Sequence, residues 1–199
     1  MSDPDRGGNR APITGEGLVL RVPVSADRAR WLELLHDRDQ LRFGMPAFVP
    51  LPESVEELDE RVALAADHFT APEPGTLVVA AAEDPDHFLG TVGWSFHVPP
   101  PLRVADIGYG VHADARGRGV ATRAIRVLTS WLVEDAEGPR LARVQLDHSV
   151  ENDASCRAAL AAGLPREGIR LGYLPLRDPE APDGVRRHDV CLHGIPAAT

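Results

Sequence analysis

The 199-residue chain contains no lysine, and all 21 of its basic residues are arginine. Together with the abundance of alanine, glycine and proline, this bias is typical of a GC-rich bacterial genome. The sequence also lacks any apolar run near the roughly 20 residues that a membrane-spanning helix needs, and its first residues lack the apolar core of a signal peptide. We therefore expect a cytoplasmic protein with no membrane partner.

Cysteine is scarce as well. The two residues, Cys156 and Cys191, form no C-x-x-C pair, and the eight histidines form no His-Glu-x-x-His or comparable motif. The sequence therefore predicts neither a disulfide framework nor a metal site. A covalent mechanism through Cys156 is conceivable, but burial of a small cysteine is the better interpretation.

Acidic residues outnumber basic ones, and the formal net charge is −9. This charge argues against binding to nucleic acid or to an anionic membrane, and it suits a cationic or amine-bearing partner. Apolar residues make up 43% and charged residues 26%, as in ordinary soluble globular proteins. At this length we expect a single domain, 15–199, after a flexible tail, 1–14, that is rich in proline, glycine and charge.

The hydrophobic pattern alternates between strand and helix periods along the chain. The segments predicted as strands are 17–24, 76–83, 88–98, 103–112, 143–150, 169–176 and 185–192. The segments predicted as helices are 25–38, 54–69, 119–134 and 152–162, the last ending at Gly163. This order predicts an α+β fold, a mixed and mostly antiparallel central sheet of about seven strands with helices on both faces.

The most informative segment is His112–Arg126, where an expected strand ends, a glycine-rich loop follows and an amphipathic helix begins. Gly117 and Gly119 allow a tight turn that leaves backbone N–H groups without internal partners. With the positive end of the helix dipole, these groups make an anion site. Arginines at 116, 118, 123 and 126 stand in a stretch without an acid. Because cations in a first helical turn oppose the dipole, a bound polyphosphate is the natural compensation.

Other interpretations of this loop fit less well. A surface glycine loop with its arginines in solvent is the plain structural alternative. An ATP-binding P-loop needs Gly-Lys followed by Ser or Thr, and a Rossmann fingerprint needs a third glycine where Val120-Ala121-Thr122 stands. Nucleic-acid binding through the Arg-Gly-Arg-Gly stretch is disfavoured by the negative net charge.

The segment Arg116–Ala121 resembles the Arg/Gln-x-x-Gly-x-Gly/Ala signature of the GNAT N-acetyltransferases, whose loop amides hold the pyrophosphate of coenzyme A. The preceding segment, Asp106–His112, is similar to that family's fourth strand, whose backbone binds the pantetheine arm. The resemblance covers approximately residues 17–195.

The second half resembles one branch of that family, the ribosomal-protein N-terminal (Rim-type) acetyltransferases. The matching motifs are Asn152-x-x-Ser155, Gly163-Leu164 and Glu167-Gly168, with Leu164 in place of the usual phenylalanine. The resemblance implies the GNAT fold, acetyl-CoA as co-substrate and no metal. The residues that it implies for cofactor binding are Gly110, Val111, Arg116, Gly117, Arg118, Gly119, Val120, Ala121 and Asn152.

Acetyl transfer to an amine requires a group that takes the amine's proton and a group that protonates the departing thiolate. Following the resemblance, Asp106 is the first candidate for the base, Glu167 the second and His112 the third. Ser155 and Tyr109 are the candidate proton donors to the thiolate.

Each of these residues also has a purely structural interpretation. Asn152 and Ser155 suit an ordinary helix N-terminus, Tyr109 suits a packed strand, and Asp106 suits a salt bridge at a sheet edge.

The sequence thus predicts an N-acetyltransferase that carries an acetyl group directly from acetyl-CoA to a primary amine in a ternary complex. The Rim-type resemblance favours a protein N-terminal α-amine, and substrate choice is expected in the loops 43–52, 99–102 and 177–184. The alternative is a non-catalytic module that binds or senses acyl-CoA. The resemblance also allows a homodimer.

Overall fold

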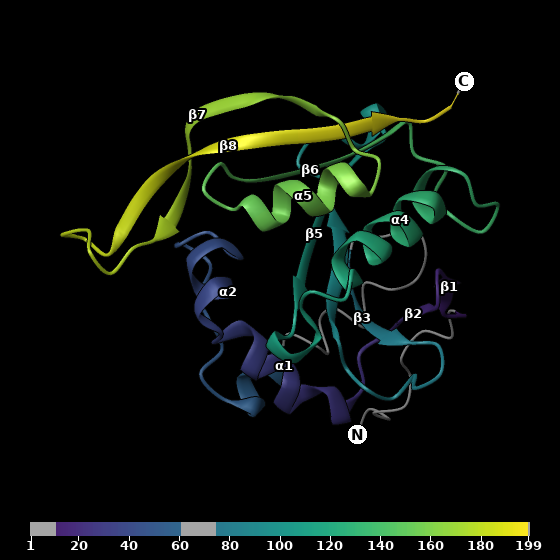
Figure 1. Ribbon diagram of the computed structural model, residues 1–199, viewed down its shortest axis with the longest axis horizontal. Coiled ribbons are helices and arrows are strands. Elements are labelled where there is room, and N and C mark those ends of the chain that lie inside the picture. Colours follow the sequence, from purple (N-terminus) through teal and green to yellow (C-terminus); the bar gives the residue numbers. More distant parts are fainter. Residues whose placement is uncertain (1–10, 61–74, 199) are drawn as a thin grey trace.

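The computed structural model describes residues 11–60 and 75–198. Within them, one eight-stranded sheet runs in the order β1-β2-β3-β4-β5-β6-β8-β7 (Figure 1). Neighbouring strands are antiparallel except β5 and β6, which are parallel. The strands are β1 (Ile13–Gly15), β2 (Leu18–Arg21), β3 (Gly75–Ala81), β4 (Gly90–Ser95), β5 (Val104–Val111), β6 (Arg143–Ser149), β7 (Arg166–Arg177) and β8 (Val185–Pro196).

Helices cover both faces of the sheet, as predicted (Figure 1). Leu77 and Val79 of β3 face the main core under α4, whereas Val78 packs against Leu34 of α1 on the opposite face. No helix in the described ranges is long and apolar enough to cross a membrane. The helical segments that lie wholly within the described ranges are η1 (Ser25–Asp27), α1 (Arg28–Leu35), α2 (Arg38–Phe43), η2 (Pro100–Leu102), η3 (Ala113–Ala115), α4 (Val120–Val133) and α5 (Asp153–Ala161).

Helix α4 supplies much of the main core. Its apolar stripe of Ala124, Ile125, Leu128 and Leu132 is buried almost completely. Burying a leucine or isoleucine side chain contributes about 1.5–3 kcal/mol. The same stripe thus confirms the predicted helix and holds its first turn firmly at the end of β5.

The N-terminal strand was not predicted. Ile13 and Thr14 pair with Leu20 and Val19, so β1 adds an edge strand to the sheet and the count rises from seven to eight. These residues belong to the segment expected to be a flexible tail. That expectation fails for 13–14, and residues 1–10 lie outside the described part.

The helix predicted over 25–38 is divided. Asp37 takes an extended conformation, and its Oδ1 accepts the N–H groups of Asp39 and Gln40 at 3.0 and 3.3 Å. A carboxylate that caps a new helix in this way ends the previous one. A second helix, α2, therefore runs to Phe43, into the segment expected to be a loop. Of the helix predicted over 54–69, residues 55–60 are helical and the rest lies outside the described residues.

A cluster of polar side chains ties α1 to the end of β5. Arg30 donates to both carboxylate oxygens of Asp114 at 2.9 and 2.8 Å and to the carbonyl of Phe88 at 2.9 Å. His112 lies between Asp114 and Glu33, 2.9 and 3.0 Å from their carboxylates. The hydrogen bond from Arg30 lowers the pKa of Asp114 from 3.8 to about 2.

This cluster of Arg30, Glu33, His112 and Asp114, called the clamp below, makes the free energy of unfolding depend on pH in the acidic range. A carboxylate whose pKa is lower in the folded protein than in the unfolded chain stabilises the fold at pH values above its unfolded-state pKa. The stabilisation is lost as the pH falls through its folded-state pKa. We expect Asp114→Asn to lower Tm at neutral pH by a few degrees, since a partly exposed pair contributes at most about 1 kcal/mol. The difference from the unchanged protein should narrow from about pH 4 toward about pH 2. Thermal melts across this range check it, and a pH-independent difference would contradict it.

Candidate functional site

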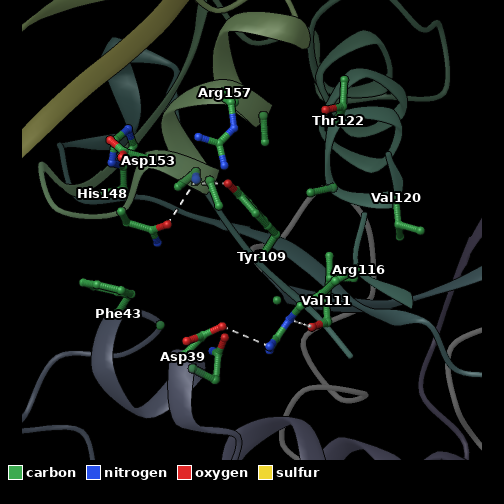
Figure 2. A pocket seen from close by; sticks show the side chains of 18 of the residues that line it. Asp39, Phe43, Tyr109, Val111, Arg116, Val120, Thr122, His148, Asp153 and Arg157 are labelled. Carbon is green, nitrogen blue, oxygen red and sulfur yellow. Dashed lines mark hydrogen bonds and ion pairs between the residues drawn. The ribbon is translucent and has the colours of Figure 1, made fainter. Parts of the chain in front are cut away.

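A cavity of about 700 Å³ opens where β5 and β6 separate. The two strands pair only where Val104–Asp106 of β5 lie beside Arg143–Gln145 of β6, and β6 then continues alongside β8. The cavity is lined by the second half of β5, the loop after it, the end of β6, the first turn of α4 and the length of α5 (Figure 2). Helix α2 closes the opposite side with Asp39, Gln40 and Phe43. The β5 edge from Ile107 to Val111 therefore faces the cavity with no strand beside it.

The glycine-rich loop has the conformation of an anion site. Gly117 and Gly119 have φ of +74° and +70°, a left-handed region that costs other residues about 1–2 kcal/mol. Gly119 is the N-cap of α4 and has no side chain that could accept the N–H groups of the first turn. The first N–H groups of the helix and its positive dipole end are thus available to a negative ligand.

The arginines of the loop divide into two kinds. Arg116 forms ion pairs with Asp37 and Asp39 of the α2 start and donates to the carbonyl of Val111 at 3.1 Å (Figure 2). It therefore fixes the loop against α2. Arg118 is exposed and does not line the cavity, and its side chain forms no hydrogen bond or ion pair with another described residue. Its charge is available to a ligand that extends past the loop.

Hydroxyl groups meet at the other end of the cavity. The Tyr109 and Ser155 side-chain oxygens are 2.7 Å apart, with Tyr109 on β5 and Ser155 on α5. Burial raises the pKa of Tyr109 above its ordinary value of 10.0, so the phenol is protonated at neutral pH. The Ser155 N–H donates to Asn152 Oδ1 at 3.1 Å, which makes Asn152 the N-cap of α5. All three residues line the cavity.

Two aspartates, Asp106 on β5 and Asp147 on β6, stand near the point where the pairing of these strands ends. Asp106 accepts a hydrogen bond from Gln145 at 2.8 Å, lies 3.3 Å from His97 Nδ1, and does not line the cavity. Asp147, two residues beyond Gln145 on β6, does line it. Burial raises the pKa of Asp147, and the charge of Arg170 opposes that shift.

The other two predicted bases are engaged elsewhere. Glu167 forms an ion pair with Arg143, and the hydrogen bond between them lowers the pKa of Glu167. His112 is buried in the clamp with Glu33 and Asp114. Neither residue lines the cavity.

The structure thus brings most of the predicted site residues together around one cavity. The predicted residues that line it are Tyr109, Gly110, Val111, Arg116, Gly117, Gly119, Val120, Ala121, Asn152 and Ser155. Asp106, Arg118 and Glu167 do not.

Sequence reasoning missed Asp147 and Arg157, which both line the cavity. Asp147 stands on the predicted strand 143–150 and Arg157 on the predicted helix 152–162. No motif marks either residue, because the side of the strand or helix that faces a cavity depends on how the elements pack. The alternation of β6 is the one available signal for Asp147.

Comparison with known proteins decides the family. A family model described as an acetyltransferase (GNAT) domain matches residues 17–165. The chain belongs to the GNAT acetyltransferases. The GNAT fold and the family predicted from the loop motif are thereby confirmed. A search of curated proteins found no match.

Solved structures of acetyltransferases share this fold. Ribosomal-protein-S5-alanine acetyltransferase from Vibrio fischeri superposes with a TM-score of 0.75 at 18% identity, over 94% of this chain and 97% of that one. Mycobacterium smegmatis RimJ, in complex with a CoA-disulfide, gives 0.75 at 21%, over 94% and 86%. Spermidine N-acetyltransferase SpeG from Vibrio cholerae, an N152L mutant, gives 0.67 at 19%, over 92% and 95%. The Rim-type resemblance thus extends to the architecture.

The N-cap of α5 in this GNAT chain can be tested apart from any ligand. We expect Asn152→Ala to lower the free energy of unfolding by about 1 kcal/mol, which is roughly 2–4 °C in Tm, because the Ser155 N–H loses its acceptor. Asn152→Asp keeps an acceptor oxygen and should melt within about 1 °C of the unchanged protein. Equal melting of the alanine variant and the unchanged protein would show that the cap contributes nothing.

Proposed function

We propose that this protein transfers an acetyl group from acetyl-CoA to a primary amine, by direct attack while both substrates are bound. One observation carries the proposal: the cavity between β5 and β6 joins an anion site at Gly117–Gly119 to the hydroxyl pair of Tyr109 and Ser155. A cofactor with a pyrophosphate at one end and a thioester at the other suits such an arrangement. That RimJ binds a CoA-disulfide supports the choice of ligand.

The loop and the strand edge divide the work of binding. The N–H groups at the start of α4 would hold the pyrophosphate, and the exposed charge of Arg118 would approach the outer phosphates. The free β5 edge near Gly110 and Val111 offers peptide groups to the amides of the pantetheine arm, much as a neighbouring strand would. Arg116 serves mainly to hold the loop and α2 in place.

Tyr109 is the proposed proton donor to the departing thiolate. Its phenol is protonated at neutral pH, and the 2.7 Å contact with Ser155 fixes its position. The bond from the amine nitrogen to the acetyl carbon forms as the bond from that carbon to sulfur breaks, and the thiolate takes a proton. A positioned acid of this kind contributes about 10²–10⁴-fold to the rate.

The acceptor is proposed to be a cationic amine that binds on the α2 side of the cavity. The acidic residues that line the cavity are Asp39, Asp147, Glu151 and Asp153. The first three form ion pairs with arginines, whereas Asp153 forms none with another described residue. Asp147, which lines the cavity, is the proposed contact for the amine. Asp106 remains the proposed base, and since it does not line the cavity it would take the proton through a water molecule.

Two of the loops expected to select the substrate lie together beside this side of the cavity. Arg177 of β7 donates to the carbonyl oxygens of Pro46 and Val49 at 3.3 and 2.5 Å, and the Ala47 N–H donates to Pro175 at 2.8 Å. We favour a protein α-amine as acceptor, as the S5-alanine acetyltransferase suggests, with a polyamine as the competing class, as SpeG suggests.

Release of free CoA thiol from acetyl-CoA, with alanine-initiated peptides or spermidine as acceptor, tests the proposal. We expect Tyr109→Phe to lower kcat by about 10²-fold or more while acetyl-CoA binding changes little, because the ring remains and only the proton donor is lost.

The matched control is Tyr173→Phe, which removes the hydroxyl of the one other tyrosine, half-exposed on β7. It should leave kcat within about twofold. Acetyl-CoA binding with no turnover on any amine would favour a non-catalytic acyl-CoA module instead.

A further inference from the structure

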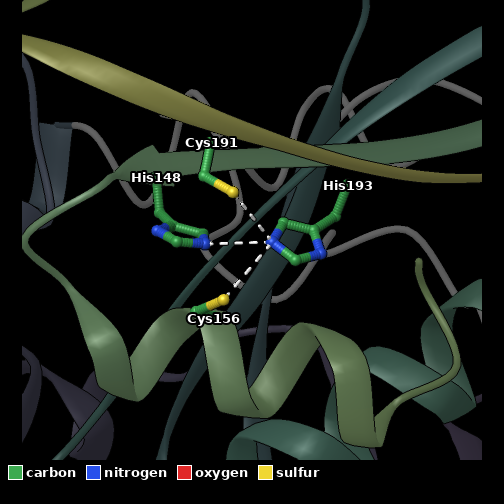
Figure 3. A group of neighbouring side chains, drawn as sticks. All are labelled: His148, Cys156, Cys191 and His193. Carbon is green, nitrogen blue, oxygen red and sulfur yellow. Dashed lines mark hydrogen bonds between the residues drawn. The ribbon is translucent and has the colours of Figure 1, made fainter. Parts of the chain in front are cut away.

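Two histidines and two cysteines converge where α5 packs on β6 and β8 (Figure 3). His148 stands on β6, Cys156 on α5, and Cys191 and His193 on β8. One donor atom from each side chain lies within 4.8 Å of the other three. His148, Cys191 and His193 are buried, and Cys156 is half-buried. Nothing in the proposed acetyl transfer uses these four groups.

The spacing of the donor atoms is close to that of a tetrahedral metal site. His193 Nε2 lies 3.2 Å from His148 Nε2, 3.4 Å from Cys191 Sγ and 3.8 Å from Cys156 Sγ. Around Zn²⁺, bonds of about 2.0–2.1 Å to nitrogen and about 2.3 Å to sulfur place two nitrogens about 3.3 Å apart and nitrogen about 3.5 Å from sulfur. The widest separation between two donor atoms, within 4.8 Å, exceeds the longest donor-to-donor distance of an ideal tetrahedral Zn²⁺ site by about 1 Å. A small side-chain rotation closes this difference.

The outer nitrogen of each imidazole is already held by a backbone carbonyl. His148 Nδ1 lies 2.8 Å from the Ser149 carbonyl oxygen, and His193 Nδ1 lies 3.0 Å from that of Leu164. Because a carbonyl only accepts, each Nδ1 carries the proton, and each neutral ring turns the lone pair of Nε2 toward the cluster. This is the second-shell arrangement by which metal-binding histidines are oriented.

The fold itself brings the four residues together. His148 pairs directly with Cys191 across β6 and β8, and His193 is two residues further along the same face of β8. Helix α5 then places Cys156 over that face. The sequence predicted no metal site because the ligands come from three elements and match no contiguous motif.

We infer that His148, Cys156, Cys191 and His193 form a structural site for a tetrahedral transition-metal ion, with Zn²⁺ the ion that the donors favour. Two imidazoles and two thiolates are a Zn²⁺ donor set, and four protein ligands leave no open position for catalysis. Binding converts two thiols to thiolates and releases their two protons.

The site would join α5, whose N-cap is Asn152 and whose first turn carries Ser155, to β6 and β8. His148 also lines the cavity, which gives the ion an entry path. Metal binding at this site does not depend on the proposed acetyl transfer.

The test begins with the full chain, treated with a chelator and kept reduced. Titration with Zn²⁺ against a chromophoric chelator should give one tightly bound ion per chain and a higher Tm. Replacement by Co²⁺ should give tetrahedral visible bands and thiolate-to-metal charge-transfer absorption. The cobalt spectrum needs no variant, so it stays informative even if a cluster substitution unfolds the chain.

The cluster variants are Cys191→Ser and His193→Gln. Each should weaken Zn²⁺ binding by at least about 100-fold, since losing a second-shell partner alone costs about 10–100-fold. The matched control is His188→Gln, a buried histidine of β8 bonded to Ser149 and outside the cluster, which should keep the affinity and the cobalt spectrum.

Three results would overturn the inference. One is a lack of Zn²⁺ binding by the reduced protein, and another is a cobalt spectrum without thiolate charge transfer. The third is a Cys156–Cys191 disulfide that forms in air whether or not Zn²⁺ is present, because a metal-bound pair of thiolates would resist oxidation.

Discussion

The separation of β5 from β6 is the constraint on which the site depends. The two strands pair over only three residues each, and then β6 stays with β8 while β5 continues beside β4. Unsatisfied peptide groups along a strand edge are costly when buried, so an edge that opens into a cavity requires water or a ligand. The same separation lets Tyr109 reach Ser155 and gives the α4 N-terminus a face open to the cavity.

The elements around this opening are held together by ion pairs and hydrogen bonds between their side chains. Arg116 joins the glycine loop to Asp37 and Asp39, and these residues start α2. The clamp of Arg30, Asp114 and His112 fixes α1 to the end of β5. On the far side, α5 depends on its Asn152 cap and on the inferred metal cluster. The cavity is therefore preformed, because side-chain contacts fix the helices and strands that line it.

Much of this could be predicted from the sequence because the signals are local. The Gly117–Gly119 turn, the apolar stripe of α4 and the Asn152 cap each occupy one short window, and the structure has all three. The division of the first helix at Asp37 was missed, although the cap that starts the second helix there is as local as the one at Asn152.

What the sequence could not predict depends on packing between distant segments. The ion pairs of Arg116 join residues almost 80 positions apart, and they hold the glycine-rich loop against α2. Asp147 faces the cavity only because β6 leaves β5. The histidine–cysteine cluster follows from the register of β6 with β8, which no local pattern reveals.

Amide hydrogen exchange of the protein with and without saturating CoA tests the central claim most directly. If the free β5 edge and the α4 start bind the cofactor, exchange should slow at 108–111 and 117–122 and stay unchanged in β7. Gly119→Glu places an anion in the phosphate site at a residue with φ of +70°, and it should abolish that protection. Bound CoA that leaves both segments unprotected would contradict the account.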